Sequence, residues 1–220
     1  IPASHPEEAM AILSRLGLFE ALPVSMKRHA ERLTHICHEG TESSGHVENV
    51  VIGSNAVSLR TVMSIAGARY PRVVKADDWL CGDVSEVADG LHRLALSSAH
   101  QRGSVAIVSG GEPTVKLTGC GKGGRNQELA LRFALLEEQK PIGRPWAFLS
   151  GGTDGRDGPT DAAGAVVDAG STGWMRRFGC DPEQRVRNND SYPALACSGD
   201  LLVTGATGTN VADLQILLIR

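Results

Sequence analysis

The chain has 220 residues, enough for one large domain or two small ones with an ordinary core. Its 22 basic and 25 acidic residues give a formal charge of −3 without a long run of one sign, which argues against a nucleic acid or a membrane surface as the main partner. Hydrophobic residues make up 41% of the chain and aromatic residues only 4%, so we expect an aliphatic core. No apolar run approaches the roughly 18–20 residues that cross a bilayer.

The first hundred residues are predicted to form two helices and then an alternation of strands and helices. Pro6, followed by two glutamates, suits the first turn of a helix, and apolar residues recur at helical spacing over residues 5–34. The serine and glycine content of residues 39–46 is typical of a loop. The alternation predicts a βαβα segment. Its strands are expected over residues 50–52 and 72–75, and its helices over residues 55–66 and 83–100.

The remaining residues are predicted to complete a mixed sheet with flanking helices, arranged in three layers as an α/β fold. Only four residues separate the first two strands of this part, so we expect them to be antiparallel neighbours. The last two strands are expected to pair with each other. The predicted strands are 104–109, 114–118, 146–149, 201–204 and 214–219, and the predicted helices are 125–138, 160–167, 171–178 and 192–197.

Residues 119–128 (GCGKGGRNQE) lie between a predicted strand and a predicted helix. Glycines allow positive φ and close approach to a ligand, and a helix that begins directly after them presents free N–H groups and its positive dipole end. This combination predicts an anion site. Arg125 is the strongest candidate in it, because a guanidinium binds phosphate or carboxylate in a bidentate manner. The alternative is a structural salt bridge to Glu112 or Glu128.

Three predicted strands end in small polar turns. The sequences VAIVSGGE (105–112) and AFLSGGTD (147–154) share one plan, and the strand 201–204 is followed by GATGTN (205–210). Open α/β sheets bind ligands at the carboxyl ends of their strands, so we expect these turns to line a common site. Asn210 in the third turn is expected to contact a substrate hydroxyl or to cap the following segment.

Three carboxylates lie within a glycine- and proline-rich stretch, GTDGRDGPTD (152–161): Asp154, Asp157 and Asp161. The spacing is not that of an EF-hand, whereas Mg²⁺ held by one or two carboxylates and by phosphate oxygens would fit it. The alternative is that these residues make turns and cap a helix.

Other fingerprints fit less well. Gly119, Gly121 and Gly124 satisfy G-x-G-x-x-G, but the helix then begins with a polar turn, and the acid expected about 20 residues further on is misplaced. A P-loop is excluded because no serine or threonine follows Lys122. No Ser-His-Asp or Cys-His arrangement is present. Phosphoryl transfer suits such a set of residues, because it depends on positioning and charge neutralisation, with a carboxylate available as general base.

Four blocks of sequence resemble the MOFRL-type glycerate 2-kinases. They are SGGEPTV (109–115), GxGKGGRNQELAL (119–131), GTDGxDGPTDAAGA (152–165) and TGxTGTNVxD (204–213), and they occur in the family's order. Residues 1–100 resemble the stretch just before that domain in the same enzymes. The resemblance implies a C-terminal MOFRL-type α/β domain at residues 103–220. Residues 1–102 would be a helical lead-in and the βαβα segment, belonging to or joining an N-terminal α/β domain.

The family transfers a phosphoryl group from ATP to D-glycerate, with Mg²⁺, to give 2-phosphoglycerate; the residues alone leave 2- or 3-phosphorylation open. Its members are about twice as long, and their N-terminal domain carries its own Gly-rich loop and a lysine used in catalysis. The resemblance thus implies that this chain is the C-terminal part, that its partner is the missing N-terminal domain, and that it has little activity alone. Pro113 replaces a common threonine without a clear consequence.

The resemblance places the site in a cleft between the two domains, with Arg125 as the functional arginine. We expect catalytic roles for Arg125, Asp154 and Asp157, and metal binding at Asp154, Asp157 or Asp161. Contacts to substrate or phosphate are expected from Gly110, Gly111, Glu112, Gly121, Lys122, Gly123, Gly124, Asn126, Glu128, Thr207 and Asn210.

Two other functions stay open: NAD(P)H-dependent reduction of hydroxypyruvate, which is an older label in the family, and non-catalytic binding or assembly. Homodimer formation is also open. The chain begins with Ile1 rather than Met, so we expect a piece of something longer or a processed product. The odd number of cysteines without CxxC spacing predicts reduced thiols in an intracellular protein, cytoplasmic or mitochondrial. The cysteines are Cys37, Cys81, Cys120, Cys180 and Cys197.

Overall fold

The structure, a computed structural model, describes residues 6–34, 48–77 and 79–220. The chain divides into two compact units, residues 1–50 and 51–220. In the first unit, α1 (Pro6–Arg15) and α2 (Val24–Thr34) confirm the two predicted helices. The predicted loop at residues 39–46 and Cys37 lie outside the described residues. The domain boundary predicted at residue 102 concerns the longer protein and stays a prediction.

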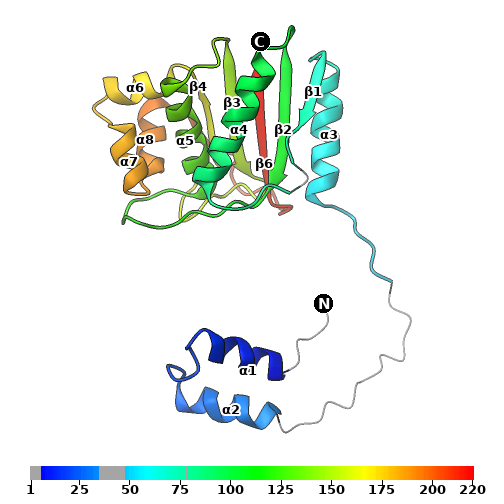
Figure 1. Ribbon diagram of the computed structural model, residues 1–220, viewed down its shortest axis with the longest axis vertical. Coiled ribbons are helices and arrows are strands. Elements are labelled where there is room, and N and C mark those ends of the chain that lie inside the picture. Colours follow the sequence, from blue (N-terminus) through cyan, green and yellow to red (C-terminus); the bar gives the residue numbers. More distant parts are fainter. Residues whose placement is uncertain (1–5, 35–47, 78) are drawn as a thin grey trace. The chain divides into compact units, whose positions relative to one another are not determined.

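The second unit is built on one open, six-stranded mixed sheet (Figure 1). Its strand order is β1-β2-β6-β3-β4-β5; β1 and β2 are parallel, and all other neighbours are antiparallel. Because β2 and β3 are both antiparallel to β6, their carboxyl ends lie at the same edge. The strands are β1 (Arg72–Lys75), β2 (Val105–Gly111), β3 (Trp146–Gly152), β4 (Gly164–Asp168), β5 (Leu201–Leu202) and β6 (Asp213–Ile219).

Helices cover the two faces of the sheet unequally. Figure 1 shows α4 and α5 in front of the strands, with α6, α7 and α8 gathered beside β4. Helix α3 packs on β1 and β2. Every residue of β2 is buried, as in a strand covered on both faces, whereas burial alternates along β6. The helices are α3 (Asn55–Gly67), α4 (Val84–Ala99), α5 (Arg125–Gln139), α6 (Ser171–Arg177), α7 (Pro182–Arg187) and α8 (Ser191–Ser198).

The core confirms the aliphatic prediction, with one aromatic group at its centre. Phe133 on α5 is fully buried, and its ring centroid lies 4.5 Å from that of Phe148 and 5.3 Å from that of Trp146. Leucine, valine, isoleucine and alanine make up most of the remaining buried side chains. The predicted fold class, a mixed α/β sheet with flanking helices, is therefore confirmed.

The strand predicted at residues 50–52 is wrong. These residues form neither helix nor strand, and the exposed fractions of Val50, Val51 and Ile52 are 70%, 77% and 96%. A short apolar run becomes a strand only where a neighbouring strand offers hydrogen bonds, and here the sheet ends at β1. The alternation therefore starts at α3, and the parallel unit is β1, α4 and β2.

The strand predicted at residues 114–118 is also wrong. Thr114 makes one isolated bridge, to Asp83, and the antiparallel neighbour of β2 is β6 from the far end of the chain. Residues 115–118 form no strand, and the N–H of Thr118 donates to Asn189 Oδ1 instead of to a neighbouring strand. Sequence proximity was therefore a poor guide to pairing at this point.

Three predictions near the C-terminus need correction. Residues 160–167 were predicted as a helix, but β4 occupies 164–168, because its residues pair with both β3 and β5. The predicted closing pair of strands does not form, since β5 pairs with β4 and β6 lies between β2 and β3. Helix α7 was not predicted; Asp181, which caps it, and Pro182 at its first position were the available signals.

Candidate functional site

The carboxyl ends of β2 and β3 flank the first residue of β6. In the register of the sheet, Asp213 lies opposite Gly111 of β2 and opposite Gly152 of β3. The two Ser-Gly-Gly ends thus meet at one edge, with a carboxylate between them. Strand β5 runs in the same direction as β3, because both are antiparallel to β4, and it also ends at this edge. The predicted convergence of three turns is confirmed.

Arg125, the first residue of α5, reaches across this edge to the carboxylate. Its Nε lies 2.6 Å from Asp213 Oδ2, and its Nη2 lies 2.9 Å from Asp213 Oδ1. Its Nη1 lies 3.1 Å from Glu112 Oε1. The Arg125 side chain is 34% exposed and that of Asp213 only 1%. The hydrogen bonds from Arg125 to Asp213 raise the pKa of the guanidinium, which keeps it charged.

Asp213 was not among the predicted site residues, although it closes the fourth sequence block. Its partner lies 88 positions away, so no local spacing signals the pair. The amide of Asn55, also not predicted, donates to the carbonyl oxygens of Val211 and Asp213 at 2.9 and 2.8 Å. Gly110 packs on the same amide, and a Cβ there would lie 2.1 Å from Asn55 Oδ1. Asn55 and Gly110 thus fix the start of β6.

The N–H groups of residues 118–122 are already occupied. The loop between α7 and α8 supplies their acceptors: Asn189 Oδ1 accepts from Thr118 and Gly119, at 2.7 and 2.9 Å. Farther along, Asn188 Oδ1 and its carbonyl oxygen accept from Cys120 and Gly121, and Asp190 Oδ1 accepts from Lys122 at 2.8 Å. This part of the Gly-rich segment binds protein, and its N–H groups are not directed at a ligand.

The N-terminus of α5 already holds one anion, the carboxylate of Asp157. Asp157 Oδ1 accepts from Asn126 N at 3.1 Å, and Oδ2 accepts from Gln127 N at 2.8 Å. Asp157 is 3% exposed, and burial raises its pKa more than these hydrogen bonds lower it. Among the described residues, the N–H groups of 123–125 have no acceptor, so these three are not satisfied within the protein.

Two predicted binding residues on α5 are buried and bonded to other parts of the protein. Asn126 is fully buried, and its Oδ1 accepts from the hydroxyl of Ser150 at 2.6 Å. Glu128 is 2% exposed and accepts from Arg132 and Asn189. Their roles in substrate binding stay predictions, and the contacts favour a supporting role beneath the site.

The turns after β3 and β5 bring Asp154, Thr207 and Asn210 together as predicted. Asn210 Nδ2 lies 3.5 Å from Asp154 Oδ2, and the N–H of Thr207 donates to the Asp154 carbonyl oxygen at 3.3 Å. Asp154 Oδ1 accepts from the N–H of Arg156 at 2.9 Å. The Asp154 Oδ2 atom thus keeps most of its capacity to bind a ligand.

Lys122 and Asp161 meet at Tyr192 of α8. The Tyr192 hydroxyl donates to Asp161 Oδ1 at 2.7 Å, and Lys122 Nζ lies 4.4 Å from the centre of the Tyr192 ring. The hydrogen bond from Tyr192 lowers the pKa of Asp161, and the positive charge of Lys122 acts in the same direction. Both side chains are exposed. The predicted phosphate contact of Lys122 would require it to leave this ring.

The three predicted metal ligands do not gather. Within residues 6–34, 48–77 and 79–220, no group of three or more His, Cys, Asp or Glu side chains is arranged to hold a metal ion. Both oxygens of Asp157 accept from α5, and Asp161 accepts from Tyr192. Asp154 is the one of the three whose surroundings best fit a metal bound together with a ligand.

A cavity of about 660 Å³ opens beside Arg125. Gly123, Gly124, Arg125 and Glu112 form its polar side. The other side is mainly apolar, and the exposed fractions of Trp79 and Leu117 are 48% and 75%. The rest of the lining is Pro113, Thr114, Val115, Gly158 and Pro159.

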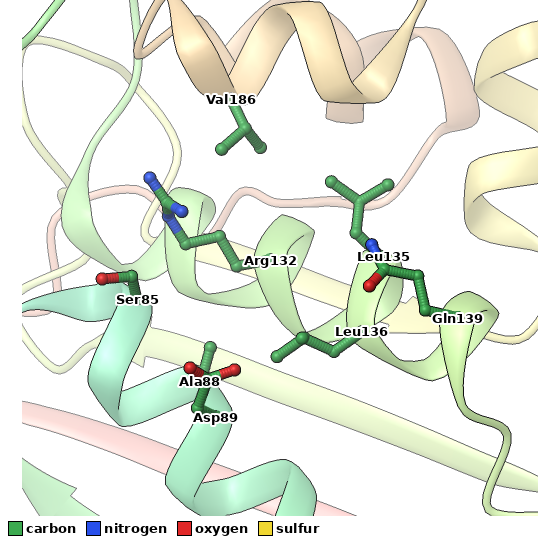
Figure 2. A pocket seen from close by; sticks show the side chains of 8 residues that line it. All are labelled: Ser85, Ala88, Asp89, Arg132, Leu135, Leu136, Gln139 and Val186. Atoms are coloured by element: carbon green, nitrogen blue, oxygen red, sulfur yellow. The ribbon is translucent and has the colours of Figure 1, made fainter.

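A smaller hollow of about 220 Å³ lies between α4 and α5, with Val186 of α7 above it (Figure 2). Figure 2 shows Leu135 and Leu136 of α5 on its wall, with Arg132 extending from the same helix. Arg132 is bound to Glu128 at 2.8 Å. This hollow has a mostly apolar lining and no convergent acids, so the edge beside Arg125 is the better candidate site.

Comparisons with known proteins agree on one family. The sequence profile of the MOFRL family matches residues 105–213. The chain is 36% identical to a glycerate kinase of Macaca fascicularis over 265 residues, covering 100% of this chain and 67% of the relative. It is 54% identical to a D-glycerate 2-kinase of Thermotoga maritima over 227 residues, covering 99% and 50%.

The fold agrees as well. The crystal structure of a glycerate kinase from Thermotoga maritima superposes with a TM-score of 0.78 and 34% identity over the aligned residues, covering 99% of this chain and 51% of that one. The chain spans two thirds of the macaque relative and about half of the Thermotoga proteins. Among the described residues, no helix is both long and apolar enough to span a membrane. The chain belongs to the MOFRL-type glycerate kinase family.

Proposed function

We propose that this chain is the C-terminal part of an enzyme that phosphorylates D-glycerate on its 2-hydroxyl with ATP. One observation carries the proposal: Arg125 is held by a buried carboxylate at the edge where the Ser-Gly-Gly ends of two strands meet. The family relationship supports the same reaction. The relatives extend beyond this chain, so the longer protein is expected to supply the rest of the site.

The donor count of Arg125 supports a role in binding phosphate. A guanidinium has five N–H donors; Nε and Nη2 of Arg125 each donate one hydrogen bond to Asp213, and Nη1 makes an ion pair with Glu112. Even if the ion pair engages one donor, two N–H donors remain for an anion, beside the N–H groups of 123–125, which have no acceptor among the described residues. Preorganised donors of this kind stabilise the charge that moves onto the leaving group in phosphoryl transfer.

We include Mg²⁺ in this proposal. The carboxylates of Asp213 and Glu112 outnumber the single guanidinium of Arg125, so this part of the site carries a net negative charge. In phosphoryl transfer the metal neutralises charge on the phosphate oxygens, and one or two protein carboxylates suffice to hold it. Asp154 is the residue we expect to contact it, through Oδ2. Asp157 fits this role poorly, because both of its oxygens accept N–H groups of α5. We therefore assign Asp157 to holding the first turn of α5.

The same contact argues against hydroxypyruvate reduction. A dinucleotide would place its pyrophosphate on the N-terminus of the helix after the glycines. Here the carboxylate of Asp157 occupies two of the N–H groups such a ligand would need. The N–H groups of residues 123–125 lie just before the helix or at its first residue. They suit a terminal phosphate better than the pyrophosphate of a dinucleotide.

The experiment is a coupled assay of the longer enzyme with ATP and D-glycerate, with the position of the phosphate identified in the product. Arg125→Ala should lower kcat/KM by about 10³-fold or more, and Arg125→Lys should recover little, because lysine cannot bind in a bidentate manner. Arg102→Ala, at an exposed arginine after α4, should stay within about twofold. A loss below about threefold for Arg125→Ala would contradict the role given to Arg125.

The 220-residue chain should be assayed beside the longer enzyme. We expect its turnover to be at least about 100-fold lower, because the opposing groups of the site would be missing. Turnover comparable to that of the longer enzyme would contradict the proposal that the site is shared with an N-terminal half.

A further inference from the structure

The cavity beside Arg125 has two chemically different sides. Gly123, Gly124 and Arg125 offer N–H groups and a cation on one side. On the other side, Trp79 and Leu117 leave 48% and 75% of their surface exposed. Large exposed apolar side chains that converge on one concave surface, next to donors for an anion, are typical of a ligand site.

The apolar side is held in place by the backbone. The N–H of Leu80 donates to the Gly110 carbonyl oxygen at 2.8 Å, and the N–H of Glu112 donates to the Leu80 carbonyl oxygen at 2.9 Å. Gly111 makes this approach feasible: its φ is +154°, and a Cβ there would lie 2.1 Å from Leu80 O. The backbone next to Trp79 is therefore fixed beside Glu112, which contacts Arg125.

Glycerate does not account for this surface. It has three carbons, each bearing oxygen, so it has no apolar face to cover an indole and a leucine. A cavity of about 660 Å³ is also large for so small an acid, and it lies in the range of sites for ligands of nucleotide size. The ligand that fits both sides carries phosphates at one end and a flat, weakly polar ring at the other.

We propose that this cavity binds the nucleotide, with the purine base against Trp79 and Leu117 and the phosphates toward Gly123, Gly124 and Arg125. Aromatic side chains bind bases by stacking, which needs no specific hydrogen bonds. The inference rests on the proposed function, and assigns ATP to this half of the enzyme. The competing occupant of the apolar side is a surface of the missing N-terminal half.

Binding to the longer enzyme tests the assignment with two probes, ADP and inorganic tripolyphosphate. Trp79→Ala should weaken ADP binding at least about tenfold and leave tripolyphosphate within about twofold, because only ADP carries a base. Trp174→Ala is the matched control, since Trp174 is 47% exposed and lies on α6. Leu117→Ser, at a side chain 75% exposed, repeats the test where folding is not at risk.

A spectroscopic readout accompanies the affinities. ADP should quench tryptophan fluorescence in the unmodified enzyme and in Trp174→Phe, and the quench should be lost in Trp79→Phe. Unchanged ADP affinity in both Trp79→Ala and Leu117→Ser, or a quench that survives Trp79→Phe, would overturn the base subsite.

Turnover separates this inference from the proposed function. If the enzyme phosphorylates glycerate and Trp79→Ala raises KM for ATP but not for glycerate, both stand. If Trp79→Ala raises only KM for glycerate, or only loosens the contact with the N-terminal half, the subsite is wrong and the kinase function stands. If ADP binding depends on Trp79 but glycerate is not phosphorylated, the subsite stands and the reaction is wrong.

Discussion

The two halves of the Gly-rich segment look alike in sequence and differ in what their backbone does. The N–H groups of residues 118–122 bind acceptors of residues 188–190, whereas those of residues 123–125 have no acceptor among the described residues. In the first half, a Cβ on Gly119 would lie 2.5 Å from Asn188 Cα, so that glycine permits two loops to pack. In the second half, Gly123, Gly124 and Arg125 line the cavity.

The length of a glycine-rich motif therefore does not indicate how many of its N–H groups are available to bind an anion. The first half binds the α7–α8 loop and sets the position of the second half. Only the second half, with Arg125, lines the cavity. Changes in the first half should therefore act on stability, and changes around the second half should act on turnover.

After Arg125→Ala, the largest effect is expected from Asp213→Asn, which removes the partner that orients Arg125. We expect kcat/KM of the longer enzyme to fall about 100-fold, because the guanidinium loses its orientation. The free energy of unfolding should fall by about 2 kcal/mol, less than for a fully buried pair because Arg125 is 34% exposed.

A double-mutant cycle sharpens this prediction. Adding Asp213→Asn to Arg125→Ala should cost little further activity, because each substitution by itself already removes the oriented guanidinium. Asp89→Asn, at an exposed position of α4, is the control and should leave kcat/KM within about twofold. Additive losses in the cycle would show that Asp213 does not act through Arg125.

Asn189→Ala tests the first half of the segment. Asn189 is 5% exposed, has φ +51°, and accepts the N–H groups of Thr118 and Gly119. The substitution should lower the free energy of unfolding by roughly 2–3 kcal/mol, through lost hydrogen bonds and strained φ. ADP affinity of the folded protein should change less than about threefold.

Asn188→Ala is the matched control, because the Asn188 side chain makes a longer bond, 3.3 Å, to the N–H of Cys120. We expect less than about 1 kcal/mol from it in urea unfolding. If Asn189→Ala spared stability but abolished ADP binding, the contrast between the two halves would be wrong.

The smallest effect concerns the pH dependence of stability at Asp157. Burial raises the pKa of Asp157 in the folded protein above its unfolded value, so the folded state holds the proton more tightly. The contribution of this group to stability is then full below the unfolded pKa and is lost as pH rises through the folded pKa. Compared with Asp157→Asn, the wild type should therefore become relatively less stable as pH rises from acid to neutral.

Urea unfolding of the wild type and of Asp157→Asn at several pH values gives the difference in their free energies of unfolding. The contributions of the other carboxylates are the same in both proteins and cancel in this difference. An advantage that grows with pH would mean that the N–H groups of Asn126 and Gln127 outweigh burial. Asp157 would then be an ionised cap, and its carboxylate would occupy the N-terminal N–H groups of α5 as a full negative charge.

Much of the site could be predicted from the sequence because its signals are local. The Ser-Gly-Gly ends of two strands, the glycines before α5 and the arginine at its first position all follow one another along the chain. Helices α4 and α5 were predicted nearly to their ends, since amphipathic spacing is a property of neighbouring residues. The prediction of an anion site at Arg125 rests on these signals.

Long-range pairing was beyond such signals. Strand β6 is inserted between β2 and β3, and this places Asp213 between two glycine-rich strand ends. Asp157 reaches the first turn of α5 from 31 positions away, and residues 188–190 reach the Gly-rich segment from about 70. The hydrophobic periodicity of a sequence does not predict the order in which strands pair in a sheet.

The sequence by itself therefore determined that an arginine and a glycine-rich turn would lie together at the start of a helix in an α/β fold. The tertiary structure decided which N–H groups remain open, which carboxylate orients the arginine, and which apolar side chains share the cavity. The physical reason is that local conformation depends on neighbouring residues. The partner of a buried polar group is instead fixed by the packing of segments that the chain brings together from far apart.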